Sequence, residues 1–314
     1  MKKIAIQMDK IEDIDIDFDS SFLIGIEAQK RNYEIFYYNP QDLFYNEGLI
    51  QANGYYIELI ENNKKYFKYL SKKICVNFHD FMFIFIRQDP PFDMNYITST
   101  YLLDYLPSKN VVINNPTSIR NFSEKISAFN FKEFMPPTIV TQDVGIIKNF
   151  LMSHKDIVTK PLYGNGGTGI YRHTIKNNKL PDMFKGMLIL EEPLMAQKYI
   201  PEIKDGDRRL ILIDGEYVGS VARMPMKDSI KANFHAGGTA KKTNLIRRDK
   251  EICATLSKTL KENQLFFVGI DIIGDYLTEI NVTSPTGIRQ INELNDTNLE
   301  KIFWDKLETK YNIV

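Results

Sequence analysis

The sequence predicts an α/β protein, and three observations support that prediction. Residues 1–120 alternate short apolar runs with segments of helical spacing, the pattern of a mostly parallel sheet covered by helices. Phe81–Ile86 is fully apolar, as expected of a central strand that is buried on both faces. Phe267–Pro285 reads as two strands joined by a turn at Gly274-Asp275. A parallel α/β unit is therefore followed, later in the chain, by a region that contains a β-hairpin.

The N-terminal elements bring polar residues to one edge of the sheet. In chain order we expect a strand at Lys3–Met8, a helix capped by Asp19 or Ser20 that runs to Asn32, a strand at Tyr33–Tyr38, a small hairpin at Asn53-Gly54, and a helix that starts at Ser118. Ligands gather at the carboxyl ends of strands in open α/β sheets. Arg87 and Asp89 should therefore lie beside Met8 and Asp9 at one rim.

The acidic loop Asp9–Asp19 contains alternating aspartates, which raises the possibility of a calcium site. An EF-hand that begins at Asp15 needs glycine at its sixth position and glutamate at its twelfth, where this chain has Ser20 and Ile26. We therefore reject calcium binding. A solvated acidic loop is favoured on general grounds over a functional one.

The hairpin within Phe267–Pro285 carries oxygen ligands among apolar residues. Asp271 lies on the first strand, and Glu279 and Asn281 lie two residues apart on the second, so that they share a face. A carboxylate removed from water is costly unless a cation or a hydrogen-bond donor accompanies it. Two carboxylates and an amide form a hard, incomplete ligand set that suits Mg²⁺ bound partly by phosphates. A surface hairpin with its polar residues facing water remains the alternative.

A glycine-rich turn follows a short β-branched strand that ends near Lys160. Glycines at 164, 166, 167 and 169 allow backbone N–H groups to wrap an anion, and the lysine supplies a positive charge. No Gly-Lys-Ser/Thr follows, so this is not a P-loop, and a Rossmann loop would open directly into a helix. Taken alone, such a turn is more often a flexible hairpin than a phosphate site.

Four segments of the chain resemble prokaryotic glutathione synthetase, a member of the ATP-grasp superfamily: MDKIEDIDIDFDSSF, RQDPPFD, QKYIPEIKDGDRR and FVGIDIIGDYLTEINVTSPTGIR. The resemblance extends over nearly the whole chain. It implies an ATP-grasp fold with an N-terminal Rossmann-like, pre-ATP-grasp domain built on a parallel sheet. It also implies that ATP drives the joining of γ-glutamylcysteine to glycine through an acyl phosphate.

The resemblance also implies roles for individual residues. Nucleotide binding is expected of Lys125, Lys160, Gly164, Gly166, Gly167, Gln197, Lys198, Tyr199 and Asp207. Mg²⁺, or Mn²⁺ in its place, is expected at Asp271, Glu279 and Asn281. Catalytic charge stabilisation is expected of Arg209, Arg223 and Lys160, and substrate binding of Asp9, Ser20, Arg87, Asp89, Ser284 and Arg289.

The resemblance divides the chain at residues 120 and 200. Residues 1–120 form the N-terminal domain, 121–200 the nucleotide-binding lid, and 201–314 the C-terminal subdomain with the metal site and a mobile loop at 224–242. In the last part we expect strands at Leu210–Ile213 and Glu216–Arg223, a turn at Asp214-Gly215, a helix at Asp249–Asn263 and a final helix opened by Asn295 or Asp296.

The loop departs from the family pattern at two positions. Lys231 and Thr239 stand where we expect arginine. Lysine cannot make the planar two-pronged contact of arginine. The contact between this loop and the substrate is therefore the least secure of the inferred roles.

Composition restricts the partners. Forty basic and forty acidic side chains give no net charge to attract nucleic acid or a membrane surface. We find no signal peptide and no apolar run long enough to span a bilayer. Cys75 and Cys253 are too few and too far apart for a disulfide framework, which favours the cytoplasm and free thiols. A homo-oligomer, either a dimer or a tetramer, is expected from the family resemblance alone.

Two alternatives to this function remain. One is a different ATP-grasp ligase, with the same phosphate-binding residues and another acceptor. The other is a non-catalytic, nucleotide-binding regulator on the same scaffold. RQDPPFD and TSPTGIR argue against other ligases, and the complete set of Asp271, Glu279 and Asn281 argues against a regulator.

Overall fold

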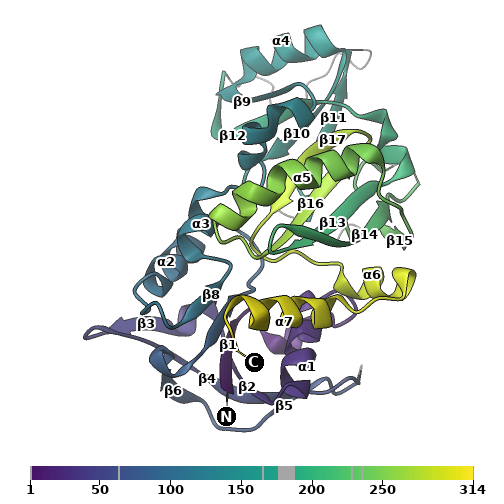
Figure 1. Cartoon of the computed structure of the whole chain (residues 1–314). Helices are drawn as coiled ribbons and strands as arrows, with labels where there is room; N and C mark the ends of the chain where they lie inside the picture. Colours follow the sequence, from purple (N-terminus) through teal and green to yellow (C-terminus); the bar gives the residue numbers. More distant parts are fainter. Residues whose placement is uncertain are drawn as a thin grey trace.

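The computed structural model describes residues 2–62, 64–164, 166–175, 188–227, 229–234 and 237–313. These residues form three β-sheets with helices packed on them, stacked along the long axis of the molecule (Figure 1). Both chain termini lie in the part built on the first sheet. In the described part of the chain, no helix is long and apolar enough to cross a membrane.

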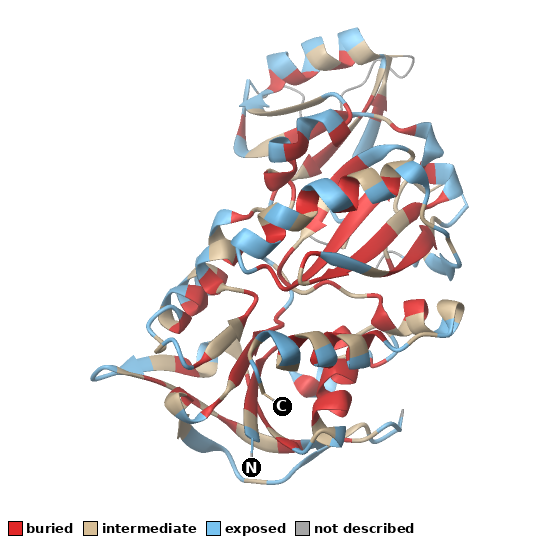
Figure 2. Cartoon of the chain, viewed as in Figure 1, coloured by how far each residue is buried: buried red, intermediate tan, exposed pale blue. Residues whose placement is uncertain are grey.

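The first sheet has the strand order β3-β4-β2-β1-β7-β8. Its parallel centre consists of β1 (Lys2–Gln7), β2 (Tyr33–Tyr38), β7 (Phe83–Ile86) and β8 (Val111–Ile113). The antiparallel part consists of β3 (Leu43–Asn46), β4 (Leu49–Leu59), β5 (Phe67–Tyr69) and β6 (Ile74–Asn77). Along β1, Ile4 and Ile6 enter one apolar core and Ala5 enters the other, so both faces of the sheet are buried (Figure 2).

The expected hairpin at Asn53-Gly54 is wrong, because both residues lie inside β4. A Cβ atom on Gly54 would lie 2.2 Å from the carbonyl oxygen of Tyr37 and 2.7 Å from the ring of Phe36. Glycine is therefore required here by close packing of β4 on β2 rather than by a turn.

The helices of the first unit begin at capping residues. Asp19 caps α1 (Ser20–Lys30), and Asp93 caps α2 (Met94–Leu103). Asn115 caps α3 (Pro116–Asn121) by accepting from the backbone N–H of Ser118. The helix therefore starts two residues before Ser118, where we had expected it to start, since proline suits the first helical position.

The second sheet has the order β11-β10-β12-β9. Its strands are β9 (Thr138–Asp143), β10 (Asp156–Pro161), β11 (Tyr171–Thr174) and β12 (Ile189–Lys198), with α4 (Val144–His154) packed on it. The third sheet has the order β15-β14-β13-β16-β17 and is antiparallel throughout. Its strands are β13 (Asp207–Ile213), β14 (Glu216–Met224), β15 (Thr239–Lys241), β16 (Phe267–Ile273) and β17 (Tyr276–Asn281), and α5 (Arg247–Glu262) packs on it.

Both turns expected in the third sheet are confirmed. Asp214 and Gly215 have φ angles of 50° and 70°, and Gly274 has a φ of 57°. Positive φ at both central residues, as at Asp214-Gly215, and positive φ at a first-position glycine, as at Gly274, are both found in tight two-residue hairpins. Short 3-10 turns occur at Ile11–Asp13, Pro40–Asp42, Phe78–Asp80, Ser127–Phe134 and Pro201–Asp205.

The C-terminal helices α6 (Ile288–Asn295) and α7 (Leu299–Lys310) return to the first sheet (Figure 1). Trp304 on α7 is fully buried, and its ring N–H donates to the carbonyl of Ile24 at 2.8 Å. The expected start of the last helix at Asn295 or Asp296 is wrong. Asn295 ends α6, Asp296 is its left-handed C-cap, and Asn298 caps α7. The division of the chain at 120 and 200 stays a prediction.

The two cysteines differ in exposure, which gives a first testable prediction. Cys75 on β6 is exposed and Cys253 on α5 is buried, and both are free thiols. Burial raises the pKa of Cys253 to about 12, so almost none of it is the reactive thiolate near neutral pH. With a maleimide reagent, one thiol should react in the native protein and the second only after unfolding. Equal rates for both thiols in the native protein would contradict the packing of α5.

Candidate active site

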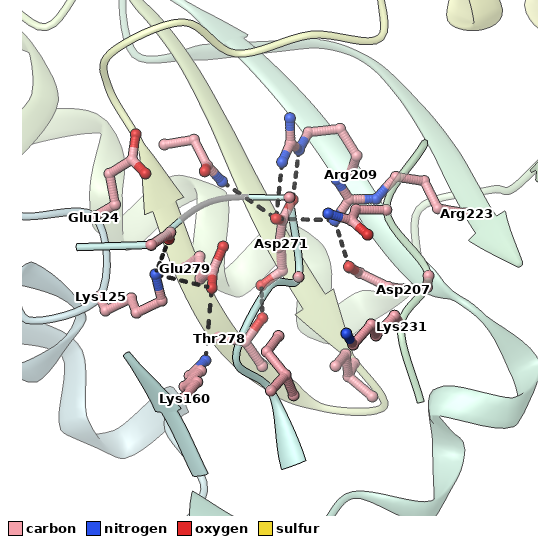
Figure 3. Close-up of a pocket in the computed structure, with 18 of the residues that line it drawn as sticks. Glu124, Lys125, Lys160, Asp207, Arg209, Arg223, Lys231, Asp271, Thr278 and Glu279 are labelled. Atoms are coloured by element: carbon pink, nitrogen blue, oxygen red, sulfur yellow. Dashed lines mark hydrogen bonds and ion pairs between the residues drawn. The ribbon is translucent and has the colours of Figure 1, made fainter. Parts of the chain in front are cut away.

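One large pocket lies between the second and third sheets and reaches the rim of the first. Figure 3 shows its central side chains converging from strands of both sheets. It gathers sixteen of the residues expected to form a site: Asp89, Lys125, Lys160, Gly164, Gly166, Gly167, Gln197, Lys198, Tyr199, Asp207, Arg209, Arg223, Asp271, Glu279, Asn281 and Ser284. Segments far apart in the sequence therefore meet around one cavity.

Two buried lysines face one carboxylate on the second-sheet side of the pocket. Lys160 Nζ lies 3.7 Å from Glu279 Oε1, and Lys125 Nζ lies 3.9 Å from the same oxygen (Figure 3). Burial lowers the pKa of Lys160, and the Glu279 carboxylate opposes that effect. Lys125 also donates to the carbonyls of Leu162 and Gly164, at 3.2 and 2.8 Å. It therefore anchors the start of the glycine-rich turn while its charge remains at the pocket.

The glycine-rich turn contacts the loop that follows β14. Gly167 has a φ of 76°, and a Cβ atom there would lie 3.2 Å from Asn233 Oδ1 and 3.3 Å from Lys231 Cδ. A side chain at this position would be strained and would press on that loop. The turn and the loop therefore form adjoining parts of the pocket wall.

The end of β12 supplies an aromatic and apolar wall. Tyr199 lines the pocket, and the guanidinium of Arg172 stacks on its outer side, 3.6 Å from the ring centroid. Arg172 is itself held by two hydrogen bonds to Asp156, at 2.9 and 2.6 Å. Val158, Ile200, Ile203 and Ile273 complete an apolar lining that the sequence analysis did not identify. Such a surface suits a flat, weakly polar ring such as adenine.

Two arginines hold Asp271 at the centre of the site. Arg209 donates to both carboxylate oxygens, and Arg223 Nη2 lies 2.8 Å from Oδ2 (Figure 3). Burial alone would raise the pKa of Asp271, but the two arginines outweigh it and hold the pKa well below its usual value. Arg223 also bonds Asp207, whose pKa burial raises to about 6. Both guanidinium groups are thus fixed in position at the pocket surface.

The candidate metal ligands lie together, as the hairpin predicts. Asp271 pairs with Glu279 across the two strands, Gly269 pairs with Asn281, and Asn281 Nδ2 lies 3.2 Å from Asp271 Oδ2. Among the described residues, no three His, Cys, Asp or Glu side chains are close enough to hold a metal by themselves. Two carboxylates with an amide fit a cation that takes its other ligands from phosphates. Asp271 is already bound by arginines, so Glu279 is the more available carboxylate.

The remaining expected substrate residues lie at the rim of the first sheet, outside the pocket lining. Asp9 Oδ2 accepts from the backbone N–H of Asp89 at 2.8 Å, so the expected meeting of the ends of β1 and β7 is confirmed. Ser20 accepts from the backbone of Ile288 at 3.4 Å, and Arg289 donates to the carbonyl of Ile16 at 3.1 Å. These contacts join the acidic loop to the start of α6.

Arg87 links the same rim to the segment after β17. Its side chain donates to Ser21 Oγ and to the carbonyl of Pro285, at 2.9 and 3.0 Å, while Ser284 donates to its backbone carbonyl. Its Nη1 is buried and has no hydrogen-bond partner within the described residues. Arg87 therefore shapes the outer end of the pocket by fixing Ser284–Pro285.

Two family models match the chain. The N-terminal domain of prokaryotic glutathione synthetase matches residues 2–120, and its ATP-grasp domain matches residues 124–296. The chain belongs to the prokaryotic glutathione synthetase family. Its activity is accordingly ATP-dependent ligation that forms glutathione, with ATP used together with a divalent metal and with small molecules as substrates.

Relatives named glutathione synthetase are similar to this chain along their whole length. Glutathione synthetase of Agrobacterium fabrum is 43% identical over 314 residues, covering 99% of this chain and 97% of the relative. Glutathione synthetase of Brucella melitensis is 41% identical over 310 residues, covering 98% and 99%. The family predicted from four sequence segments is therefore confirmed.

Solved structures confirm the ATP-grasp fold. A RiPP-associated ATP-grasp ligase from Chryseobacterium gregarium, in complex with ADP and a leader and core peptide, superposes with a TM-score of 0.62 at 16% identity. The superposition covers 100% of this chain and 98% of that ligase. D-cycloserine synthetase gives a TM-score of 0.63 at 12% identity, covering 92% and 93%. At these identities the likeness shows the fold alone.

One charged residue of the pocket, Glu124, was not expected from the sequence. Glu124 lines the cavity directly before Lys125 in the chain and lies on the lysine side of the site (Figure 3). Its adjacency to an expected nucleotide-binding lysine was the available signal. That signal is weak, because adjacent residues often point to different sides of a turn.

Proposed function

We propose that the chain joins γ-glutamylcysteine to glycine in two steps, and that the cysteinyl carboxylate is phosphorylated before the amine attacks. The observation that supports this proposal is the charge layout of the pocket. Lys125, Lys160 and Glu279 occupy one side, and the network of Arg209, Arg223 and Asp271 adjoins it. This layout places cationic groups on two sides of a single reacting centre.

In the first step, the γ-phosphoryl group of ATP passes to a carboxylate oxygen of the peptide. Phosphoryl transfer needs positioning and charge neutralisation more than covalent participation of the protein. Lys125 and Lys160 would bind phosphate oxygens, with backbone N–H groups near Gly164, Gly166 and Gly167. Gln197, Lys198, Tyr199 and Asp207 would hold the nucleoside. A divalent cation, Mg²⁺ or Mn²⁺, held by Asp271, Glu279 and Asn281, would neutralise phosphate charge.

In the second step, the glycine ammonium group loses one proton to solvent, and the lone pair that this frees forms the C–N bond. The C–O bond to phosphate breaks, phosphate leaves, and the nitrogen loses its second proton to give the amide. Negative charge develops on the former carbonyl oxygen as the nitrogen adds. A fixed guanidinium stabilises such charge at little reorganisation cost. Arg209 and Arg223 are buried and already oriented by Asp271, so we assign them this role. The rim residues Asp9, Ser20, Arg87, Asp89, Ser284 and Arg289 would bind or position the peptide.

ADP release across substrate combinations tests the proposal. We expect release to be fast only with γ-glutamylcysteine and glycine together, and glutathione to be the product. Alanine should replace glycine slowly, because a pocket rejects one added methyl by only about 1–3 kcal/mol. Turnover with glutamate or D-alanine instead would assign another ATP-grasp ligase. ATP binding without turnover on any acid would favour the regulator.

The segment Met224–Lys242 supports a prediction about closure. In the structure β14 continues through Met224 and β15 pairs with its end, Ala232 and Phe234 are buried, and Lys231 lines the pocket. Positions 228, 235 and 236 of this expected loop lie outside the described residues. We expect trypsin to cleave at Lys231 in the free enzyme, and ATP with γ-glutamylcysteine to slow cleavage by keeping this segment over the site.

Cleavage at the exposed Lys109, in a turn remote from the pocket, serves as the internal control. A rate at Lys231 that the ligands leave unchanged would contradict a lid role. Arginine is expected at position 231 in this family, so Lys231→Arg should lower the KM for the peptide. Thr239 is the second position where arginine is expected, and measuring the KM for the peptide in Thr239→Arg tests its effect.

Location and assembly are also proposals. Two free cysteines favour a reducing compartment such as the cytoplasm. A homodimer or homotetramer is proposed from family membership, and neither nucleic acid nor a membrane is expected as a partner.

A further inference from the structure

Glu124 differs from the other carboxylates near the reacting centre. Asp207 and Asp271 are neutralised by arginines, and Glu279 faces two lysines. The Glu124 carboxylate accepts a hydrogen bond from Thr283 Oγ1 at 2.7 Å, and no Lys or Arg nitrogen of the described residues lies within 4.0 Å of it. It is therefore an anion at the pocket wall with a neutral donor and no paired cation.

The position of Glu124 is fixed by the strand that carries the metal ligands. The backbone N–H of Ile280 donates to its carbonyl at 2.8 Å, and its side chain bonds Thr283. These two contacts hold it against the end of β17, on the side of the site where Lys125 lies (Figure 3). Burial raises the pKa of Glu124 and the nearby Glu279 carboxylate adds to the rise, while the hydrogen bond from Thr283 and the charge of Lys125 oppose it.

A small side cavity of about 20 Å³ opens next to Glu124. It shares Pro90, Glu124, Gly164 and Thr283 with the main pocket, and its other walls are mostly apolar. Glu124 is the one charged residue among those that line it. A space of this size holds a group about as large as a water molecule. The cavity therefore combines a volume for a small head group with a single anionic acceptor.

We propose that Glu124 binds the ammonium group of the attacking amino acid before it reacts, an inference that rests on the proposed ligase function. An ammonium group offers three N–H donors, and a carboxylate is its strongest acceptor. The reacting nitrogen must come within about 3–3.5 Å of the acyl carbon, which requires its binding group to adjoin the phosphate-binding lysines. Glu124 meets this requirement because it directly precedes Lys125 in the chain and lines the same pocket as Lys125 and Lys160.

The ammonium group of the peptide substrate is a less suitable occupant. It lies at the opposite end of the peptide from the carboxylate that is phosphorylated. If that carboxylate lies among the phosphate-binding residues, the peptide-binding role proposed for Asp9 and Asp89 would put the ammonium end at the rim where these two residues meet.

Steady-state kinetics of Glu124→Gln provide the test. Loss of a charge-assisted hydrogen bond should raise the KM for glycine by about 10- to 100-fold, and the KM values for ATP and γ-glutamylcysteine should stay near those of the wild type. Glu124→Asp keeps the charge on a shorter side chain and should show a smaller rise. Thr283→Val, which removes the hydrogen bond but keeps the carboxylate, should affect glycine less than Glu124→Gln does.

Hydroxylamine separates ammonium recognition from every other role. It is largely uncharged near neutral pH and traps an acyl phosphate as a hydroxamate, so it has no ammonium group to bind. Glu124→Gln should therefore form hydroxamate from γ-glutamylcysteine and ATP at nearly the wild-type rate. The proposal would be overturned if Glu124→Gln lost activity equally with glycine and with hydroxylamine. A raised KM for the peptide or a changed Mg²⁺ requirement in this variant would also overturn it.

Two further outcomes are informative. If Thr283→Val raised the KM for glycine as much as Glu124→Gln does, the carboxylate would act only as a structural contact, and this result would also overturn the proposal. Failure of the wild-type protein to use γ-glutamylcysteine would be failure of the proposed function instead, and the wild-type assay detects it independently of any variant.

Discussion

Glu279→Ala is expected to lower the rate of glutathione formation by about a thousandfold, or about 4 kcal/mol in activation free energy. Glu279 is the more available of the two candidate metal-binding carboxylates, because Asp271 already accepts from two arginines. It also faces Lys125 and Lys160, so its removal leaves two buried cations without their shared anion. The measurement is kcat at saturating Mg²⁺ and both substrates, with circular dichroism to verify folding.

Glu279→Gln provides a second variant that keeps the shape and removes only the charge. Asp275→Ala is the matched control, since Asp275 is an exposed carboxylate at the turn of the same hairpin. It should leave kcat unchanged. Calorimetric titration of Mg²⁺ in the presence of ADP should show weaker Mg²⁺ binding in Glu279→Gln than in the wild type, and unchanged binding in Asp275→Ala. Near-normal turnover of Glu279→Ala at saturating Mg²⁺ would remove this hairpin from the site.

Arg209→Met is expected to lower kcat by about 100- to 1,000-fold, the usual consequence of losing one preorganised donor at a developing oxyanion. The substitution also leaves part of the Asp271 carboxylate buried without its partner, so the free energy of unfolding should fall by about 3–5 kcal/mol. Because the arginines depress the pKa of Asp271, their stabilisation is present above the unfolded pKa and is lost as pH falls through the folded one.

The neighbouring residue on β13 provides the control for Arg209. Arg208 points to the other face, where it bonds the fully buried Asp249 at 2.8 Å. Arg208→Met should therefore also lower the free energy of unfolding, as measured by urea denaturation, while kcat stays near the wild-type value. If the two variants lose stability equally and Arg209→Met keeps full kcat, the catalytic role of Arg209 is refuted.

Local patterns in the sequence determined the parts of the site that depend on neighbouring residues. The period of a strand places Glu279 and Asn281 on one face. The tight turn at Gly274 pairs Ile272 with Leu277, but a shift of one residue in the register, which the sequence did not predict, is needed to bring Asp271 opposite Glu279. The positive φ angles of Gly166, Gly167 and Gly169 similarly follow from a residue type that tolerates them. The shared face of Glu279 and Asn281 and the glycine conformations need only a few adjacent residues, so the sequence could predict them.

Only the tertiary structure decided which distant charged groups form ion pairs and which glycines are required by close packing rather than by a turn. Lys125, Lys160 and Glu279 belong to three separate segments, and only the packing of the second sheet on the third brings them together. Asn53-Gly54 predicted a turn, yet glycine is required at position 54 because β4 lies so close to β2. In the sequence, Glu124 is notable only as the residue before Lys125. In the structure it lines the pocket and accepts a hydrogen bond from Thr283. Ion pairing, burial and close approach depend on which strands meet, and no periodicity along the chain encodes that.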